Sequence, residues 1–343
     1  KILQKMEPLE RFIEANPDDV LPIDQDDIDD IQACAKYIKE IYAYLLQSEK
    51  QYHLSPDFLT RQKYLSADDR TILYDWISRA HCKFNLANES FFHFVTLCDK
   101  LLERIQLFPY DQKLVGIAVL LICSKFEQSY IPSLRHYVQI MEDQNVRYVN
   151  CELCVQKYGE NFRRYAAIGE EYETPDAVLQ SQNSLPPCAQ CMRGAIMMAE
   201  EQILHALDFH LSIPTSLGFL RRFAKICDMK ARDRYIAFYL GELCAMDDQM
   251  VVKWSPSQIA TGCIAMTRRL TRKPSWSQEL VQYSGFLEEE VREVLQDVSA
   301  VLKSLALSPK VKYIRRKYAQ QERFYAVSVL IEQVVGQVVQ PAK

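Results

Sequence analysis

Two cysteine pairs have the spacing of metal ligands. Cys151 and Cys154 form the first C-x-x-C pair, and Cys188 and Cys191 form the second. Residues three apart on a tight turn can direct both thiolates at one ion, so two such pairs could supply four ligands to a structural zinc. The separation between the pairs is longer than in compact zinc ribbons. Two alternatives therefore stay open: a structural zinc site, or unliganded cysteines in a loop. Neither would be catalytic.

Lys125 is another residue whose chemistry could be functional, because it lies at the end of an apolar run. Residues 114–123 are apolar throughout, and Lys125 and Glu127 lie within the next four residues. A buried central helix with a charged end suggests a docking surface. The simplest interpretation of Lys125 with Glu200 is a partly exposed intramolecular salt bridge, worth about 0 to 1 kcal/mol.

A further pair of charges lies inside an expected core helix. Leu73, Trp76 and Ile77 recur at helical spacing, which predicts a buried face. Arg70 and Asp75 lie on the same segment and are expected to form a structural ion pair rather than a partner contact.

The composition favours a mostly helical, intracellular protein of about two domains. The chain has 343 residues, 9 of them glycine, with 48% hydrophobic and 25% charged residues. A net charge of −4 gives no basic field for phosphate backbones, so a protein partner is expected and direct nucleic-acid binding is not. The N-terminus has no signal-peptide core, and the apolar run at 114–123 is too short to span a bilayer. Because residue 1 is not Met, we expect a fragment of a longer chain.

Motifs for enzyme catalysis are missing from the sequence. It contains no glycine-rich phosphate loop, no His-Glu-x-x-His and no obvious nucleophile with a positioned base. A binding protein is therefore favoured over a hydrolase or transferase.

Hydrophobic periodicity predicts two series of helices. The first series comprises Thr71–Phe84, Asn88–Ile105, Tyr110–Glu127, Leu134–Met141 and Ile196–Leu207. The second series follows Pro214 and comprises Pro214–Phe223, Arg232–Met246, Pro256–Leu270, Trp276–Tyr283 and Leu287–Leu302. Each series has one apolar helix in the same ordinal place, so the architecture is expected to be two five-helix units in tandem.

A separate helix is expected to precede both units. Asp29 or Asp30 could cap it, and it would run to about Lys50. Its aromatic and aliphatic face is either core or a surface for a partner, and it consists of Ala33, Tyr37, Ile41, Tyr44 and Leu45.

An ordered set of residues along both units resembles one family. In the first unit these residues are Arg70, Ile72, Leu73, Asp75, Trp76, Phe84, Asp99, Leu114–Gly116, Ser124–Glu127, Pro132, Glu200 and Leu204. In the second they are Pro214, Thr215, Phe219, Leu220, Arg222, Phe223, Pro256, Ser257, Ala260, Trp276, Ser284, Gly285 and Ile314–Tyr318. With this series the chain resembles the cyclins over essentially its whole length, and more closely the mitotic, B-type cyclins.

The resemblance implies a non-catalytic activator of a cyclin-dependent Ser/Thr protein kinase that controls mitotic progression. In the family, the lysine and glutamate that match Lys125 and Glu200 hydrogen-bond to backbone around the kinase C-helix. The matching apolar positions are Ile122, Phe126, Leu204, Phe209 and Leu211, and the N-terminal helix adds Tyr37, Ile41 and Tyr44 to the same interface. No cofactor is required, kinase substrates are further partners, and the nucleus and cytoplasm are the implied compartments.

The chain departs from the family at the patch that recruits Arg-x-Leu substrates. This patch retains Ile72, Leu73 and Trp76, but Asp69, Arg79 and Lys113 stand at other positions of it. Because two replacements are basic, we expect a cationic motif to bind poorly or not at all.

The resemblance also implies domain boundaries. We expect an N-terminal segment at 1–66, a first cyclin box at 67–211 with an insertion at about 133–193, a second box at 212–310 and a tail at 311–343. The alternative functions are a transcription-initiation protein with the same tandem fold, which would need a basic face, and a scaffold.

Overall fold

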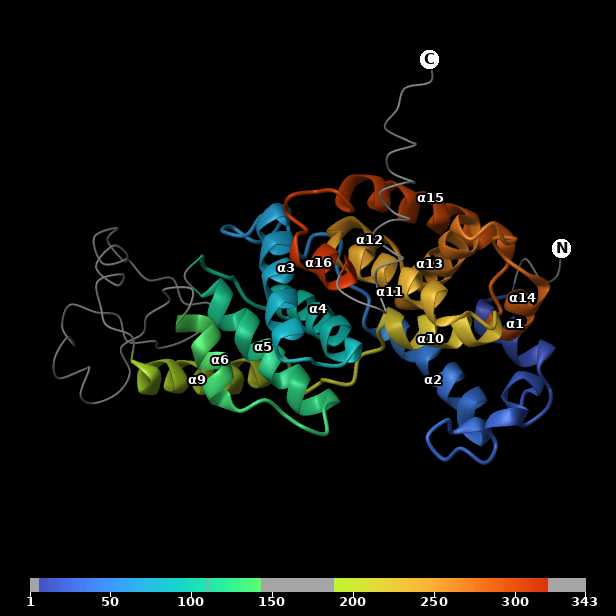
Figure 1. Ribbon diagram of the computed structural model, residues 1–343, viewed down its shortest axis with the longest axis horizontal. Helices are drawn as coiled ribbons and strands as arrows, with labels where there is room; N and C mark the ends of the chain where they lie inside the picture. The colour runs from blue at the N-terminus through green and yellow to red at the C-terminus, as the bar shows by residue number, and fades with distance from the viewer. Residues whose placement is uncertain (1–5, 110, 143–187, 320–343) are drawn as a thin grey trace, which may run out of the picture. The chain divides into compact units, whose positions relative to one another are not determined.

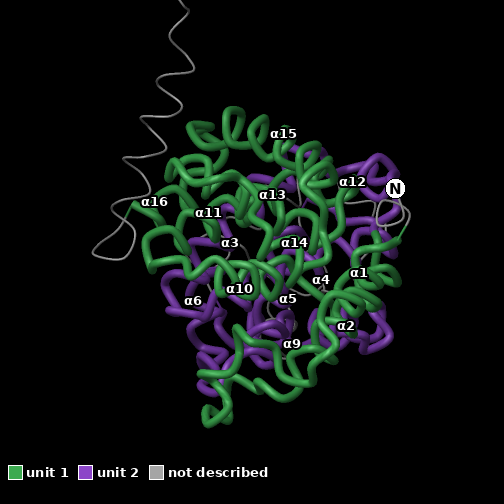
Figure 2. Tube along the Cα trace, turned by 90° about the vertical axis from the view of Figure 1, so that its right-hand side faces the viewer, with its two compact units in different colours: residues 1–53, 213–343 green, residues 54–212 purple. Residues whose placement is uncertain are grey.

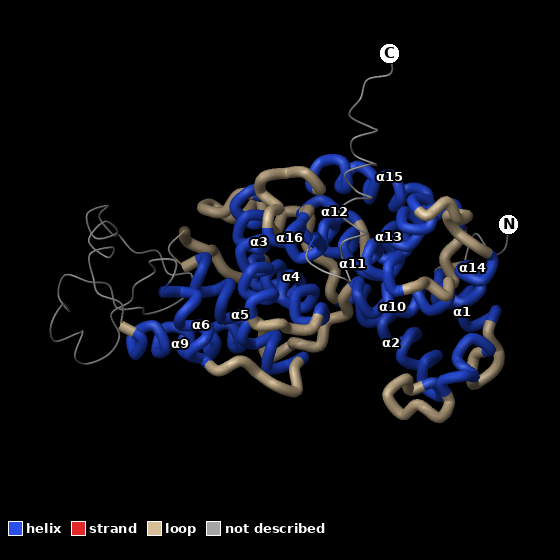
Figure 3. Tube along the Cα trace, in the orientation of Figure 1, coloured by secondary structure: helices blue, strands red, loops and turns tan. Residues whose placement is uncertain are grey.

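The computed structural model describes residues 6–109, 111–142 and 188–319. Every regular element in these ranges is a helix and none is a strand (Figure 3), which confirms the expected all-α class. The chain divides into two compact units, Leu54–Ser212 and the combination of Lys1–His53 with Ile213–Lys343 (Figure 2). Among the described residues, none of the helices combines the length and hydropathy needed to cross a membrane.

The unit Leu54–Ser212 consists of five helices arranged around one of them. They are α3 (Ala67–Lys83), α4 (Asn88–Leu102), α5 (Gln112–Glu127), α6 (Leu134–Glu142) and α9 (Ala189–Ala206). Helix α5 contacts each of the other four (Figure 1). Its residues from Leu114 to Ser124 are all buried, which agrees with an apolar sequence on every face.

A buried ion pair joins α3 to α4. Arg70 Nε donates to Asp99 Oδ1 at 2.8 Å and Nη2 donates to Oδ2 at 2.7 Å, while the Tyr74 hydroxyl donates to Oδ1 at 2.8 Å. Arg70 and Asp99 are almost completely buried. This bidentate partner lies on the next helix, and the ion pair of Arg70 with Asp75 expected from the sequence stays a prediction.

The second five-helix repeat lies in the other unit. Its expected helices are α10 (Ser216–Ile226), α11 (Ala231–Met246), α13 (Pro256–Leu270), α14 (Gln278–Ser284) and α15 (Glu288–Leu305), and α12 (Asp248–Lys253) and α16 (Tyr313–Ala319) are additional. Helix α13 packs against α10, α11 and α15. Its start agrees with the predicted cap, because the Ser255 side chain accepts from the backbone N–H of Gln258 and Pro256 occupies the first turn.

The N-terminal part of the chain packs on this second repeat. It contains α1 (Pro8–Ala15), the 3-10 helices η2 (Pro22–Asp27) and η3 (Ala35–Tyr37), and α2 (Ile38–Gln51). Helix α1 contacts α14, and α2 contacts α13. The predicted start of α2 at Asp29 or Asp30 is wrong by about two turns. Cys34 has a φ of 52°, in the left-handed region, so the chain cannot continue as one α-helix through it.

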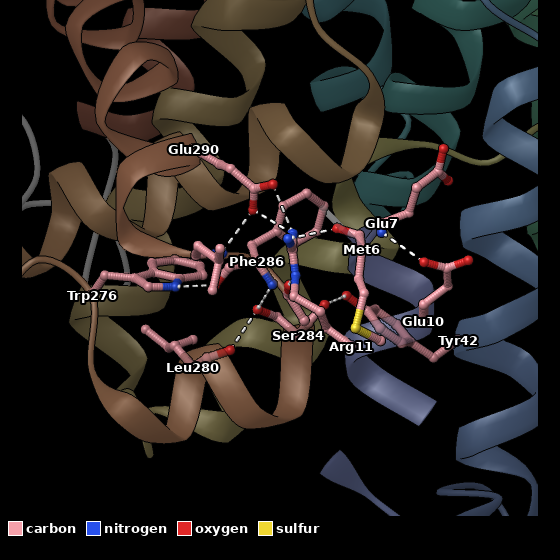
Figure 4. Close-up of polar contacts among 12 residues, drawn as sticks. Met6, Glu7, Glu10, Arg11, Tyr42, Trp276, Leu280, Ser284, Phe286 and Glu290 are labelled. Atoms are coloured by element: carbon pink, nitrogen blue, oxygen red, sulfur yellow. Dashed lines mark hydrogen bonds and ion pairs between the residues drawn. The ribbon is translucent and has the colours of Figure 1, made fainter. Parts of the chain in front are cut away.

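Arg11 ties α1 to the beginning of α15 (Figure 4). Its guanidinium donates from Nε to the Gly285 carbonyl at 2.6 Å, from Nη1 to the Met6 carbonyl at 2.7 Å, and from Nη2 to both Glu290 carboxylate oxygens. Gly285 has a φ of 77°, and a Cβ there would lie 2.0 Å from the Pro8 carbonyl oxygen. Only glycine fits this close approach. The domain boundaries expected from the sequence stay a prediction.

Candidate functional site

The end of α5 and the middle of α9 bring together the charged residues singled out from the sequence. Lys125 Nζ donates to Glu200 Oε1 at 2.6 Å and to Oε2 at 2.8 Å. The Lys125 side chain is 48% exposed and the Glu200 side chain 15% exposed. The intramolecular salt bridge therefore forms, and the ammonium group keeps a solvent-facing side from which it can donate further.

Helix α9 presents Glu200 on a partly exposed stripe. Met197 precedes Glu200 by three residues and Leu204 follows it by four, so the three side chains share one face of the helix. Met197 is exposed and Leu204 is half-buried. The opposite face is made of small and apolar residues that are fully buried, including Ala195, Ala199 and Ile203.

Apolar side chains flank the Lys125–Glu200 pair in sequence. Phe126 is 50% exposed and Phe209 is 59% exposed, which is unusual for residues of this size. Ile122 is buried beneath the surface, and Leu211 is partly exposed. Two consecutive residues in the left-handed region, Asp208 and Phe209, turn the chain after α9.

Arg104 and His93 fix the segment that follows α9. Arg104 Nη1 donates to the Ala206 carbonyl at 2.6 Å and to Asp208 Oδ2 at 2.7 Å. His93 Nε2 lies 2.6 Å from the Leu211 carbonyl oxygen, and the His93 ring meets the Phe126 ring edge to face at 4.9 Å. These contacts join Phe126 and Leu211 through one buried side chain.

The three residues predicted for the N-terminal helix are all exposed, Ile41 and Tyr44 within α2 and Tyr37 at the end of η3 directly before it. Tyr37 is 65% exposed, Ile41 40% and Tyr44 58%, and their spacing places them on one face. Of the two alternatives for this stripe, core or surface, the structure shows a surface.

The opposite face of α2 is fixed by buried polar contacts. The Tyr42 hydroxyl donates to the Ser284 carbonyl at 2.8 Å (Figure 4). Glu49 accepts from the Ser257 N–H at 2.9 Å, from the Ser257 hydroxyl at 2.6 Å and from the Ser255 hydroxyl at 3.2 Å. Burial raises the pKa of the Glu49 carboxyl above its ordinary value, although these hydrogen bonds act in the opposite direction.

The residues of the predicted substrate patch lie on α3 and at the start of α5. Ile72 and Arg79 are exposed and Trp76 is partly exposed, at a spacing that gives one helix face. Leu73 is buried, and Lys113 is partly exposed in the first turn of α5. Asp69 is exposed three residues before Ile72 on the same helix, and its carboxylate accepts from the Ser66 N–H in the capping box of α3.

The structure describes two of the four predicted metal ligands. Cys188 occupies the N-cap position of α9 without a side-chain cap hydrogen bond, and Cys191 is fully buried in its first turn. Cys151 and Cys154 lie outside the described residues. Within the described ranges, no group of three or more His, Cys, Asp or Glu side chains is arranged to hold a metal ion.

The sequence interpretation missed three residues in or near this site. Met197 could have been found from its position one turn before Glu200. His93 gave no signal, because a single histidine in an apolar helix resembles an ordinary core residue. Tyr130 lies in the segment after α5 and is 93% exposed, which the sequence alone does not show.

Two family models match the chain in tandem. The cyclin N-terminal domain matches residues 40–212, and the cyclin C-terminal domain matches residues 214–333.

Curated relatives cover most of the chain. It is 28% identical over 298 residues to "G2/mitotic-specific cyclin-B" of Dictyostelium discoideum, which covers 86% of this chain and 57% of that protein. It is 27% identical over 323 residues to the protein of the same name from Marthasterias glacialis, covering 94% and 70%. It is 29% identical over 301 residues to the human "G2/mitotic-specific cyclin-B2", covering 88% and 64%. The chain thus spans 57% to 70% of the length of these three relatives.

A solved structure supports the same fold. A viral cyclin from herpesvirus saimiri superimposes with a TM-score of 0.55 at 17% identity, covering 76% of this chain and 97% of the viral one. At this identity the likeness concerns the fold alone.

Proposed function

Because the chain belongs to the cyclin family, we propose that it is a regulatory subunit that binds and activates a cyclin-dependent Ser/Thr protein kinase during mitosis. The observation that carries the proposal is the Lys125–Glu200 pair, which lies on the surface of the first five-helix unit. The names of the relatives, all G2/mitotic-specific cyclins, support the mitotic assignment.

The proposed mechanism follows from what an active kinase requires. A glutamate of its C-helix must pair with the lysine that holds the ATP phosphates, and its activation loop must leave the substrate site. A partner shifts the kinase toward that state only if it binds that state more tightly. The ammonium of Lys125 and the carboxylate of Glu200 would bind backbone groups at the ends of the C-helix.

Exposed apolar side chains would supply most of the binding energy. Phe126, Phe209 and Met197 are all about half exposed and leave water on binding. The face formed by Tyr37, Ile41 and Tyr44 would add a second contact, because aromatic side chains are strongly enriched in protein interfaces.

The remaining roles belong to the same proposal. The subunit itself would be non-catalytic and would need no cofactor to activate the kinase. It would act in the nucleus and cytoplasm, and the basic-rimmed patch on α3 would select substrates other than Arg-x-Leu proteins. A zinc held by Cys151, Cys154, Cys188 and Cys191 stays a prediction, which zinc analysis of the purified chain tests directly.

The test is histone phosphorylation by a mitotic cyclin-dependent kinase with and without the chain. We expect no activity from the chain alone, and activity when the two are mixed. Binding without activation would replace the proposal by a scaffold role. Specific DNA binding without kinase binding would favour the transcription-initiation alternative.

A further inference from the structure

Helix α9 ends in a C-terminal cap made of two backbone hydrogen bonds. The Asp208 N–H donates to the His205 carbonyl at 3.0 Å, and the Phe209 N–H donates to the Leu204 carbonyl at 2.9 Å. These two bonds, together with a left-handed φ of 51° at Asp208, form the Schellman motif. The residue in the place of Asp208 is most often glycine, because a Cβ is unfavourable in the left-handed region.

Three other helices in the described part of the chain end in the same way. Helices α3, α10 and α13 each end with one left-handed residue and the same two bonds, and these residues are Asn85, Asp228 and Arg272. The residues that follow Asn85 and Asp228 are Leu86 and Met229, and both are buried. This agrees with the motif, which commonly packs an apolar residue at this position against the end of the helix.

Phe209 has the same place after α9 but a different conformation. Its φ is 57°, so two left-handed residues follow one another, and its side chain is 59% exposed. A bulky side chain rarely adopts this conformation. Its ring meets the His205 ring edge to face at 5.3 Å. The cap of α9 therefore turns an aromatic ring toward solvent, where the caps of α3 and α10 bury an apolar side chain.

Arg104, which lies shortly after the end of α4, binds this cap. Its Nη1 donates to the carbonyl of Ala206, the last residue of α9, at 2.6 Å. The same nitrogen donates to Asp208 Oδ2 at 2.7 Å. The last carbonyls of a helix have no partner within the helix, and a cation near them interacts favourably with the helix dipole. Arg104 thus joins the end of α9 to the side chain of its left-handed residue.

We propose that Arg104 is a positioning residue of the kinase-binding surface, because it fixes the cap that turns Phe209 outward before the kinase binds. An aromatic side chain that is already oriented loses less conformational freedom on binding, which raises the affinity. Arg104 acts through Asp208 and Phe209 rather than through a contact of its own with the kinase. The inference rests on the proposed function for its effect on kinase affinity, whereas the effect of Arg104 on the cap does not.

The first experiment measures hydrogen exchange in the chain alone. We expect Arg104→Ala to speed the exchange of residues 204–211 roughly fivefold, the range of a charged contact that is partly exposed. The internal control is the cap of α3 at residues 82–87, where exchange should not change. The matched variant is Arg61→Ala, which removes an exposed pair with Asp57 in the same unit and should leave both caps unchanged. Exchange of residues 204–211 at the wild-type rate in Arg104→Ala would overturn the inference.

The second experiment measures affinity for a mitotic cyclin-dependent kinase in a double-mutant cycle. We expect Arg104→Ala to weaken binding roughly fivefold in the wild-type chain and to have no further effect in a Phe209→Ala chain. A role in general stability would instead lower the affinity of both chains. Asp208→Asn should bind within about twofold of wild type, because asparagine tolerates the left-handed region and its side-chain oxygen still accepts from Arg104.

The two experiments separate the role of Arg104 from the function of the chain. Equal losses of affinity on Arg104→Ala with and without Phe209 would overturn the inference and leave the proposed function standing. A wild-type chain that binds no kinase would contradict the proposed function, and the exchange experiment would still decide whether Arg104 holds the cap.

Discussion

Lys125 Nζ and the Glu200 carboxylate form a two-point contact, at 2.6 and 2.8 Å, between the end of α5 and the middle of α9. The lysine side chain is nearly half exposed, so the pair contributes only about 0 to 1 kcal/mol to the stability of the chain. Charged side chains that add little to folding are free to act in binding, and they can be removed without unfolding the protein.

The buried pair of Arg70 and Asp99 is expected to behave in the opposite way. Arg70→Leu leaves the Asp99 carboxylate buried without its bidentate partner, which should cost about 3 to 5 kcal/mol of unfolding free energy. Urea denaturation measures this directly. Arg61→Ala, which removes an exposed pair with Asp57 in the same unit, is the matched control and should change stability by less than about 1 kcal/mol. Similar losses in the two variants would contradict the expected role of burial.

Gly285→Ala should detach α1 from the second repeat. The substitution forces a side chain into the left-handed region and against the Pro8 carbonyl oxygen, so we expect a loss of about 1 to 3 kcal/mol. Thermal unfolding provides the measurement. Gly218→Ala is the control, because a Cβ at this helical position meets nothing within 4 Å and should stabilise the chain by about 0.5 to 1 kcal/mol. Equal stability of the two variants would show that the close approach at Gly285 does not contribute to the free energy of unfolding.

Glu49 should make the stability of the chain depend on pH. Burial raises the folded pKa of its carboxyl above the ordinary value of 4.5. The resulting contribution is present below about pH 4.5 and is lost as the pH rises through the folded pKa. Glu49→Gln does not titrate at this position. Its unfolding free energy should therefore rise relative to that of wild type between pH 4.5 and pH 7, by about 1.4 kcal/mol for each pH unit by which folding raises the pKa of Glu49. If the difference in unfolding free energy between the two chains stayed constant or reversed over this range, burial would not destabilise the charged carboxyl.

An Arg-x-Leu peptide should not bind the patch on α3. Arg79 is exposed there and Lys113 is partly exposed, so a cationic peptide meets positive charge. Fluorescence anisotropy of a labelled peptide is expected to give no binding at micromolar concentrations. Arg79→Ala/Lys113→Gln should bind more tightly than wild type if the charges are responsible. Micromolar binding to the wild-type chain would refute the prediction.

Long helices with a strong local sequence pattern were predicted correctly. Helix α13 begins and ends where its cap and apolar face indicate, and α5 begins within two residues of the prediction and ends at Glu127 as expected. Elements set by tertiary contacts were missed. Helix α1 has only eight residues and depends on Arg11, whose partners Gly285 and Glu290 are more than 270 positions away. No local pattern encodes such a contact.

In the candidate site, too, the sequence predicted residues that carry a sequence signal and missed those that depend on tertiary contacts. Lys125 and Glu200 were named from an ordered resemblance, and the structure brings them into contact. The bidentate partner of Arg70, Asp99, was not predicted, because it comes from α4 and periodicity reports only local spacing. His93 was overlooked because its contacts, with the Phe126 ring and the Leu211 carbonyl oxygen, form only on folding.

The most direct test of the central claim is kinase activation by Lys125→Ala/Glu200→Ala, titrated beside the wild-type chain. Each substitution should cost about 2 to 5 kcal/mol in binding. The control is Arg61→Ala/Asp57→Ala, which removes a pair that is exposed on both sides, at 3.2 Å. We expect all three chains to unfold at nearly the same temperature, and only Lys125→Ala/Glu200→Ala to lose activation. Full activation by this folded variant would contradict the assignment of the kinase-binding surface.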